Sequence, residues 1–140
     1  MMQTIQLIEF LYSNGDLREN FNDDEIISLA KHLNINSVES GTVIRSQGAP
    51  DCTLMIVITG EVILSTDGIE IDKLGAGQIF GEGSFSDLGS SYAEVVAVED
   101  STLAELGYQE FEALLKHEPK HALKFKQYFK PVSYTHLRAH

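Results

Sequence analysis

A glycine-rich stretch near the middle of the chain has the residue types that bind small anions. Gly81 and Gly83 flank Glu82, and Ser84 follows them. Because glycine has no side chain, such a turn lets the backbone approach a ligand closely. A turn of this kind that leads into a short helix directs free N–H groups at an anion such as a phosphate. The same spacing also fits glycines that serve only to let the chain turn, so both interpretations stay open.

Signatures of catalysis are absent from the sequence. Neither a Gly-x-Ser-x-Gly elbow nor a Gly-Lys-Ser/Thr phosphate loop occurs. None of the histidines falls among the expected β-strands, which argues against a histidine-based metal centre there. His117 and His121 stand four residues apart, but Pro119 lies between them and no third ligand is suggested, so we interpret them as surface histidines. We expect a protein that is not an enzyme and has no cofactor and no metal.

The charge of the chain argues against nucleic-acid and membrane partners. Its 140 residues include 21 acidic and 10 basic residues, which gives a formal net charge of −11. A nucleic-acid-binding face gathers Lys and Arg to neutralise phosphates. The first 101 residues contain only four basic residues: Arg18, Lys31, Arg45 and Lys73. The other basic residues lie between Lys116 and Arg138, where we interpret them as a solvated helix face.

Three further observations bear on location. The sequence has no apolar run of the roughly 18 residues that a membrane span needs. Its first residues lack the basic and apolar regions of a secretory signal. The single cysteine, Cys52, cannot form an internal disulfide. We expect a cytoplasmic protein.

Helices are expected on both sides of a central region. Apolar residues at positions 5, 7, 8 and 11 predict a short helix over residues 5–12, followed by a turn at Asn14-Gly15. A second helix is expected after Asn22. The Asn22 side chain can cap the first turn, and the Glu25 side chain can bond to the backbone N–H of Asn22. The helical period returns over residues 108–115 and 122–129, and Pro119 separates these two stretches.

The central region is predicted to be a β-sandwich or jelly roll. Short β-rich stretches alternate with turn signals every 8–12 residues or so, the pattern of such folds. Asp67-Gly68 favours a tight hairpin, because both residues tolerate the positive φ angles that it requires. We expect strands at residues 42–45, 53–59, 61–65, 69–74, 93–98 and 102–106.

From Leu17 to about Phe125 the chain resembles the cyclic-nucleotide-binding domain of catabolite activators, protein kinase regulatory subunits and nucleotide-gated channels. Three blocks in order carry the resemblance: residues 41–48 with Asp51 and residues 54–62; residues 74–82; and residues 93–97 with 99–106 and Phe111. The resemblance implies a mainly β fold, a double-stranded β-helix (jelly roll) with N-terminal and C-terminal helices. It also implies a regulatory role, in which cAMP or cGMP binds in a phosphate-binding cassette over residues 80–93.

The resemblance further implies which residues contact the ligand. The predicted ligand-binding residues are Phe80, Gly81, Glu82, Gly83, Ser84, Ser90, Ser91, Tyr92 and Ala93. In the family, a carboxylate at the position of Glu82 accepts a hydrogen bond from the ribose 2′-hydroxyl; here it could instead only hold the turn. The family's phosphate-pairing arginine aligns with Ser91, whose hydroxyl cannot reproduce a bidentate charged contact. Arg45 or Lys73 could reach the site from neighbouring strands.

Two functions fit this pattern. In the first, a cyclic nucleotide or another small anion binds the cassette and shifts the C-terminal helices over it. In the second, the domain has lost nucleotide binding and serves as an interaction or dimerisation module. Glu82 favours the first, whereas Ser91 and the nearby acids Asp87 and Glu94 favour the second. The helices between Phe111 and Phe129 could form a homodimer or partner contact, or could only pack within the chain.

We predict one domain over residues 1–130. Residues 131–140 have no clear period and resemble a cloning-derived tail. No helix-turn-helix follows the domain, so a DNA-regulatory role would need a further segment or a partner chain.

Overall fold

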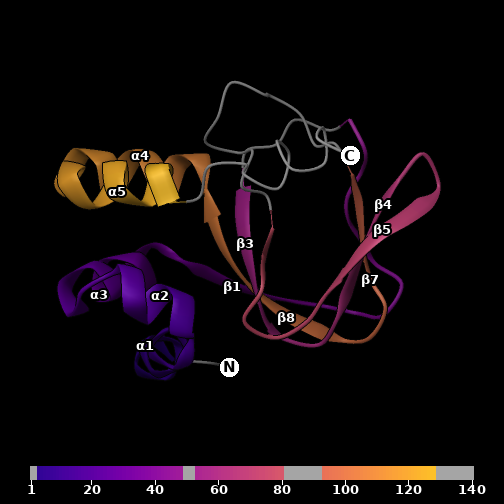
Figure 1. The fold of residues 1–140 in the computed structure, drawn as a ribbon, viewed down its shortest axis with the longest axis horizontal. Coiled ribbons are helices and arrows are strands. Elements are labelled where there is room, and N and C mark those ends of the chain that lie inside the picture. Colours follow the sequence, from indigo (N-terminus) through magenta and orange to yellow (C-terminus); the bar gives the residue numbers. More distant parts are fainter. Residues whose placement is uncertain (1–2, 49–52, 81–92, 129–140) are drawn as a thin grey trace.

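The computed structural model describes residues 3–48, 53–80 and 93–128. Within these ranges the chain forms five helices and eight strands (Figure 1). The helices are α1 (Thr4–Ser13), α2 (Gly15–Asn20), α3 (Asp23–His32), α4 (Tyr108–His117) and α5 (Pro119–Tyr128). The strands are β1 (Asn34–Val38), β2 (Val43–Arg45), β3 (Thr53–Thr59), β4 (Val62–Thr66), β5 (Ile69–Leu74), β6 (Ile79–Phe80), β7 (Glu94–Ala97) and β8 (Ser101–Gly107).

The strands form two antiparallel sheets that share one apolar core. The first sheet has the order β1-β8-β3-β6 and the second the order β2-β7-β4-β5. Most neighbours in a sheet are distant in sequence, so the chain crosses repeatedly from one sheet to the other, as in a jelly roll. The helices gather at one side of the strands (Figure 1). The predicted fold, mainly β with flanking helices, is confirmed.

β3 is covered on both faces, which explains its unbroken apolar run. Leu54 and Ile56 belong to a core cluster shared with the helices, whereas Met55 and Val57 belong to the cluster between the sheets. The sequence of a strand with both faces buried is a continuous apolar stretch, because neither face needs polar residues.

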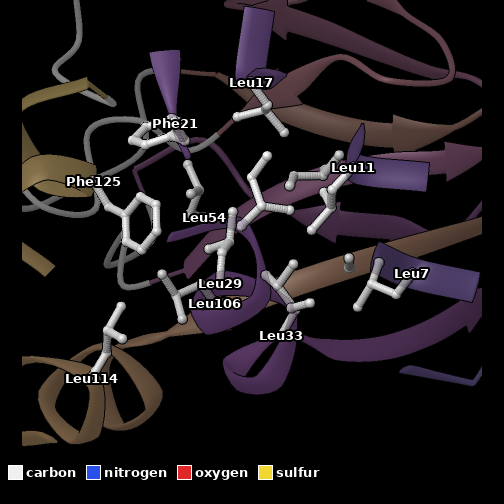
Figure 2. Close-up of a cluster of buried hydrophobic side chains, with 14 of the residues drawn as sticks. Leu7, Leu11, Leu17, Phe21, Leu29, Leu33, Leu54, Leu106, Leu114 and Phe125 are labelled. Atoms are coloured by element: carbon white, nitrogen blue, oxygen red, sulfur yellow. The ribbon is translucent and has the colours of Figure 1, made fainter. Parts of the chain in front are cut away.

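The larger core cluster joins the N-terminal helices to the C-terminal ones (Figure 2). Phe125 of α5 is fully buried, and its ring centroid lies 4.9 Å from that of Phe21. Tyr128 packs against the same Phe21 ring, edge-on, at 4.8 Å. α5 is therefore held against the segment between α2 and α3.

Several local predictions are confirmed. Asn22 and Glu25 form the predicted capping box at the start of α3. Asp67 and Gly68 both have positive φ angles, 53° and 79°, in the hairpin between β4 and β5. Pro119 is the first residue of α5, where its missing N–H does no harm.

The expected turn at Asn14-Gly15 is wrong. Gly15 begins α2, and Asn14 is its N-cap, with its Oδ1 accepting a 3.0 Å hydrogen bond from the Leu17 N–H. The Nδ2 of Asn14 also donates to the carbonyl of Gly77, at 2.8 Å. Asparagine and glycine are favoured both in turns and at helix starts, so their types did not separate the two cases.

β1 and β6 were not expected. In β1 only Ile35 and Val38 are half-buried, and the other three residues are exposed, so the strand lacks a strong apolar pattern. Its pairing with β8, with Ile35 opposite Ala104, is a long-range contact that local sequence does not reveal. β6 has only two residues, below the length that periodicity can detect.

Candidate ligand site

The two ends of the predicted cassette are anchored in the core between the sheets. Phe80 and Ala93 are each only 2% exposed and belong to the same apolar cluster. Phe80 ends β6 and pairs with Met55 of β3, and Ala93 directly precedes β7. The remaining predicted ligand-binding residues lie outside the described residues: Gly81, Glu82, Gly83, Ser84, Ser90, Ser91 and Tyr92. Asp87 lies outside them as well.

Arg45 is buried beside Phe80. Its side chain is 9% exposed, and its Cζ lies 5.9 Å from the centroid of the Phe80 ring, within cation–π range. The pairing of β2 with β7 shifts register between Val43, opposite Val96, and Arg45, opposite Val95. Without that shift Val43 and Arg45 would point to the same face. With it, Val43 is 51% exposed and Arg45 turns inward.

Lys73, the other basic residue that could have reached the site, lies on the outer face of its strand. It is exposed on β5, where it pairs with Ile63 of β4. The next residue, Leu74, is buried between the sheets, so Lys73 points away from them. Of the two alternatives, only Arg45 has its charge inside the sandwich.

Glu105 of β8 is an acid in this region that the sequence analysis missed. It lies opposite Met55, which in turn lies opposite Phe80, so the three residues form one row across the first sheet. Burial raises the pKa of Glu105, although a hydrogen bond from Asn36 and the charge of Arg45 partly oppose this. The sequence signal that could have identified Glu105 is its position as an acid within the apolar stretch at residues 103–106.

The cation and the carboxyl group therefore come from different sheets, and the carboxyl group belongs to the row that contains Phe80. Arg45 comes from the second sheet, and Glu105, Met55 and Phe80 belong to the first. A charged group over an aromatic ring, with polar and apolar neighbours, suits a small organic ligand that carries an anionic group.

Polar side chains bond α5 to α3. The Nζ of Lys124 donates to the Oε1 of Glu25 at 2.8 Å, and the same oxygen accepts from the Asn22 N–H at 2.8 Å. Burial alone would raise the pKa of Glu25, but these hydrogen bonds and the charge of Lys124 hold it below its usual range. His121 is not the surface histidine that was expected, because its Nδ1 lies 3.0 Å from the Oγ of the buried Ser28.

Two negative findings apply to the described part of the chain. No group of three or more His, Cys, Asp or Glu residues there is arranged to hold a metal ion. No helix among the described residues is long and apolar enough to cross a membrane.

Comparison with known proteins gives consistent matches. A family model described as "Cyclic nucleotide-binding domain" matches residues 35–118, more than half of the chain. The regulatory domain of Toxoplasma gondii protein kinase A, in a co-crystal with cAMP, is 25% identical with a TM-score of 0.72, over 80% of this chain and 45% of that one. The regulatory subunit of a cAMP-independent protein kinase A from Trypanosoma brucei is 26% identical with a TM-score of 0.72, over 81% of this chain and 42% of that one.

A triple mutant of the Trypanosoma brucei subunit, bound to cAMP in its A site, also matches. It is 24% identical with a TM-score of 0.71, over 90% of this chain and 50% of that one. One of its three substitutions introduces an arginine, and another removes a glutamate. The chain spans less than half the length of the first two regulatory chains.

Proposed function

The chain belongs to the cyclic nucleotide-binding domain family, and we propose that it is a regulatory domain that binds cAMP or cGMP at the cassette over residues 80–93. The observation that carries the proposal is the position of Phe80 and Ala93, which anchor both ends of the cassette beside a buried cation, Arg45. A cyclic phosphate has one negative charge, and a buried cation offsets the cost of removing that charge from water. The proposed role is binding, not catalysis.

A relative of known ligand supports this proposal. The Toxoplasma gondii regulatory domain, 25% identical to this chain, holds cAMP. The likeness extends over 80% of the chain. The proposed ligand class is therefore the one found in a related domain of the same fold.

A second function, an interaction module without nucleotide binding, is favoured by one residue and one relative. Ser91 stands where the family has its phosphate-pairing arginine, and the Trypanosoma brucei subunit, 26% identical, is described as cAMP-independent. In that subunit a triple mutant that includes a new arginine is bound to cAMP. The module would dock through the C-terminal helices, where Tyr108, Leu115 and Leu123 are 57%, 40% and 52% exposed.

Calorimetric titration of the full chain with cAMP and cGMP distinguishes the two functions. We expect measurable binding by the unmodified chain and tighter binding by Ser91→Arg. A charge-assisted hydrogen bond contributes about 1.5–3 kcal/mol, which corresponds to a gain of about 10- to 150-fold as an upper range. Glu82→Ala in the Ser91→Arg background should lose part of the gain, because the proposed ribose contact is removed.

The matched control is Ser37→Arg, which adds the same charge at an exposed position of β1. It should leave the affinity unchanged, so that a gain at position 91 is not an effect of net charge. If neither the unmodified chain nor Ser91→Arg binds either nucleotide, the sensor function is rejected in favour of the interaction module.

A further inference from the structure

Aliphatic side chains form a row on the outer face of the second sheet. Val43 of β2 lies opposite Val96 of β7, and Val96 lies opposite Ile63 of β4. The residues on either side of Val96 along its strand are buried in the core, so this outer row points away from it. Val43 is 51% exposed, and Ile63 and Val96 are partly exposed. An antiparallel sheet with one face in water usually has polar residues on that face, so the outer row needs an explanation.

No helix or strand among the described residues covers the outer row. The helices pack on the first sheet instead, through core residues of β3 and β8 such as Ile56 and Ala104. In Figure 1 the strands β4, β5 and β7 lie at the end of the molecule away from the helices. Within the described ranges, no residue of the outer row belongs to either core cluster or packs against one. The outer row is therefore accessible to a partner.

Acidic residues flank the outer row on both sides. Glu94 of β7 and Glu70 of β5 both lie opposite Ser65 of β4, and Glu94 is two residues before the valine of the outer row. On the other side of the row, Glu61 is two residues before its isoleucine. Residues two apart on a strand share a face. In the part of the chain that the structure describes, no salt bridge engages these three glutamates. The face suits an apolar side chain that lies between cations.

α5 has the complementary surface. Leu123 is 52% exposed, and the exposed Lys120 and Lys126 stand three residues before and after it. Three residues correspond to about 60° around a helix, so one lysine lies on each side of the leucine. The helix contains no acid. Its ten residues extend over about 15 Å, and four adjacent strands span about 14 Å. α5 thus matches the outer face of the second sheet in charge, apolar content and length.

α5 is held away from the second sheet of its own chain. The ring centroid of Phe125 lies 4.9 Å from that of Phe21, and the Nζ of Lys124 donates to Glu25 of α3. These contacts keep the helix with the other helices, on the side of the first sheet (Figure 1). Every copy of the chain therefore presents both surfaces, and only a second copy can bring them together.

We propose that the outer face of the second sheet binds α5 of a second copy of this chain. Leu123 of one copy packs on the outer row of the other, and Lys120 and Lys126 pair with the flanking glutamates. The two surfaces differ, so the contact is head-to-tail, and each bound copy leaves one surface free for the next. This assembly goes beyond the proposed function and does not depend on a nucleotide.

Sedimentation velocity of the full chain over a range of concentrations tests the proposal. We expect association, with a mean mass that rises with concentration. Val43→Asp places a carboxylate in the outer row, and Leu123→Asp places one on α5. Each should weaken association by at least about 100-fold, because a buried charge without a partner is strongly unfavourable. Ile5→Asp, at an isoleucine of α1 that is 68% exposed, is the matched control and should leave association unchanged.

Mixing the two variants tests the head-to-tail geometry. Val43→Asp keeps a competent α5, and Leu123→Asp keeps a competent sheet face. The two should therefore form a one-to-one complex, although neither associates alone. If α5 instead paired with α5 of the other copy, Val43→Asp would still associate, and that result overturns the proposal. An unmodified chain that is monomeric at every concentration, or association that neither variant weakens, overturns it as well.

Circular dichroism checks that the variants fold. If Val43→Asp does not, a charge exchange takes its place. Glu70→Lys with Glu94→Lys should weaken association, because these exposed or partly exposed positions then repel the lysines of α5. Adding Lys120→Glu and Lys126→Glu should restore it, since the charges are again opposite. Association that is weakened and then restored supports the proposal, and any other result overturns it.

Discussion

Replacing Lys124 by methionine should destabilise the fold more than replacing its partner Glu25 by glutamine. The two side chains form a 2.8 Å ion pair between α5 and α3. Lys124→Met keeps the aliphatic stem but leaves the carboxylate of Glu25, which is 7% exposed, without its cation. Glu25→Gln keeps an oxygen for the Asn22 N–H and leaves an ammonium group that water can reach, because the Lys124 side chain is 43% exposed.

The expected magnitudes follow from these exposures. A charged hydrogen bond contributes about 1.5–3 kcal/mol when buried, whereas an exposed ion pair contributes about 0.2–1 kcal/mol. Since Lys124 is partly exposed, we discount the buried value and expect a loss of about 1–2 kcal/mol for Lys124→Met. For Glu25→Gln we expect about 0.5–1 kcal/mol. Lys124→Met also removes the ammonium that lies 5.1 Å from the Phe21 ring, which adds to the difference.

Urea unfolding at low salt, at pH 7 and pH 3, tests this order. The folded-state pKa of Glu25 is lowered, so its ion pair stabilises the fold above the unfolded pKa of about 4.3 and is lost as the pH falls through the folded pKa. The difference between the unmodified chain and Lys124→Met should therefore be present at pH 7 and shrink at pH 3. Lys126→Met, at an exposed lysine of the same helix, is the control and should change little. A larger loss for Glu25→Gln, or a loss for Lys124→Met that does not depend on pH, would refute the reasoning.

Three other expectations can be checked with the same protein. Gly60→Ala should lower the free energy of unfolding, measured in urea, by about 2–5 kcal/mol, because Gly60 has a φ of +93° and an added Cβ would lie 2.7 Å from the Cα of Ser101. Gly15→Ala is the control, since an added Cβ there would have nothing within 4 Å, and equal effects of the two substitutions would contradict the argument. Deleting residues 131–140 should leave the melting temperature nearly unchanged, and a loss of more than a few degrees would show that the tail packs on the core. The full chain should not bind duplex DNA at physiological salt, given its net charge of −11, and tight sequence-specific binding in a fluorescence anisotropy assay would contradict this.

The fold was predictable where local chemistry and tertiary packing agree. The capping box of Asn22 and Glu25 and the Asp67-Gly68 hairpin depend on residues close in sequence, and both were found as expected. β1 depends instead on pairing with β8, about 70 residues away, and its exposed polar residues gave no periodic signal. A strand that is stabilised mainly by a distant partner is the kind of element that sequence pattern misses.

The prediction of the candidate site likewise depended on residues that are close in sequence. Residue types and the family resemblance pointed to the cassette, of which only the two ends, Phe80 and Ala93, lie among the described residues, and both are buried in one core. His117 is exposed, as predicted, but the interpretation of His121 as a surface histidine failed because its contact with Ser28 joins residues 93 positions apart. Glu105 was missed because one acid inside a strand has no local motif.

The orientation of Arg45 could not be predicted from the sequence. In a regular strand, Val43 and Arg45 share one face and Ile44 lies on the other, so a β2 with Ile44 packed against the core would expose both the valine and the arginine. The register shift between them reverses this, because a change of one residue in pairing moves every following side chain to the other face. A charge that a regular pattern assigns to solvent is thereby buried beside Phe80. Sequence pattern alone therefore could not separate Arg45 from Lys73, the two basic residues that were expected to be able to reach the cassette, because the difference in their burial depends on how β2 pairs with β7.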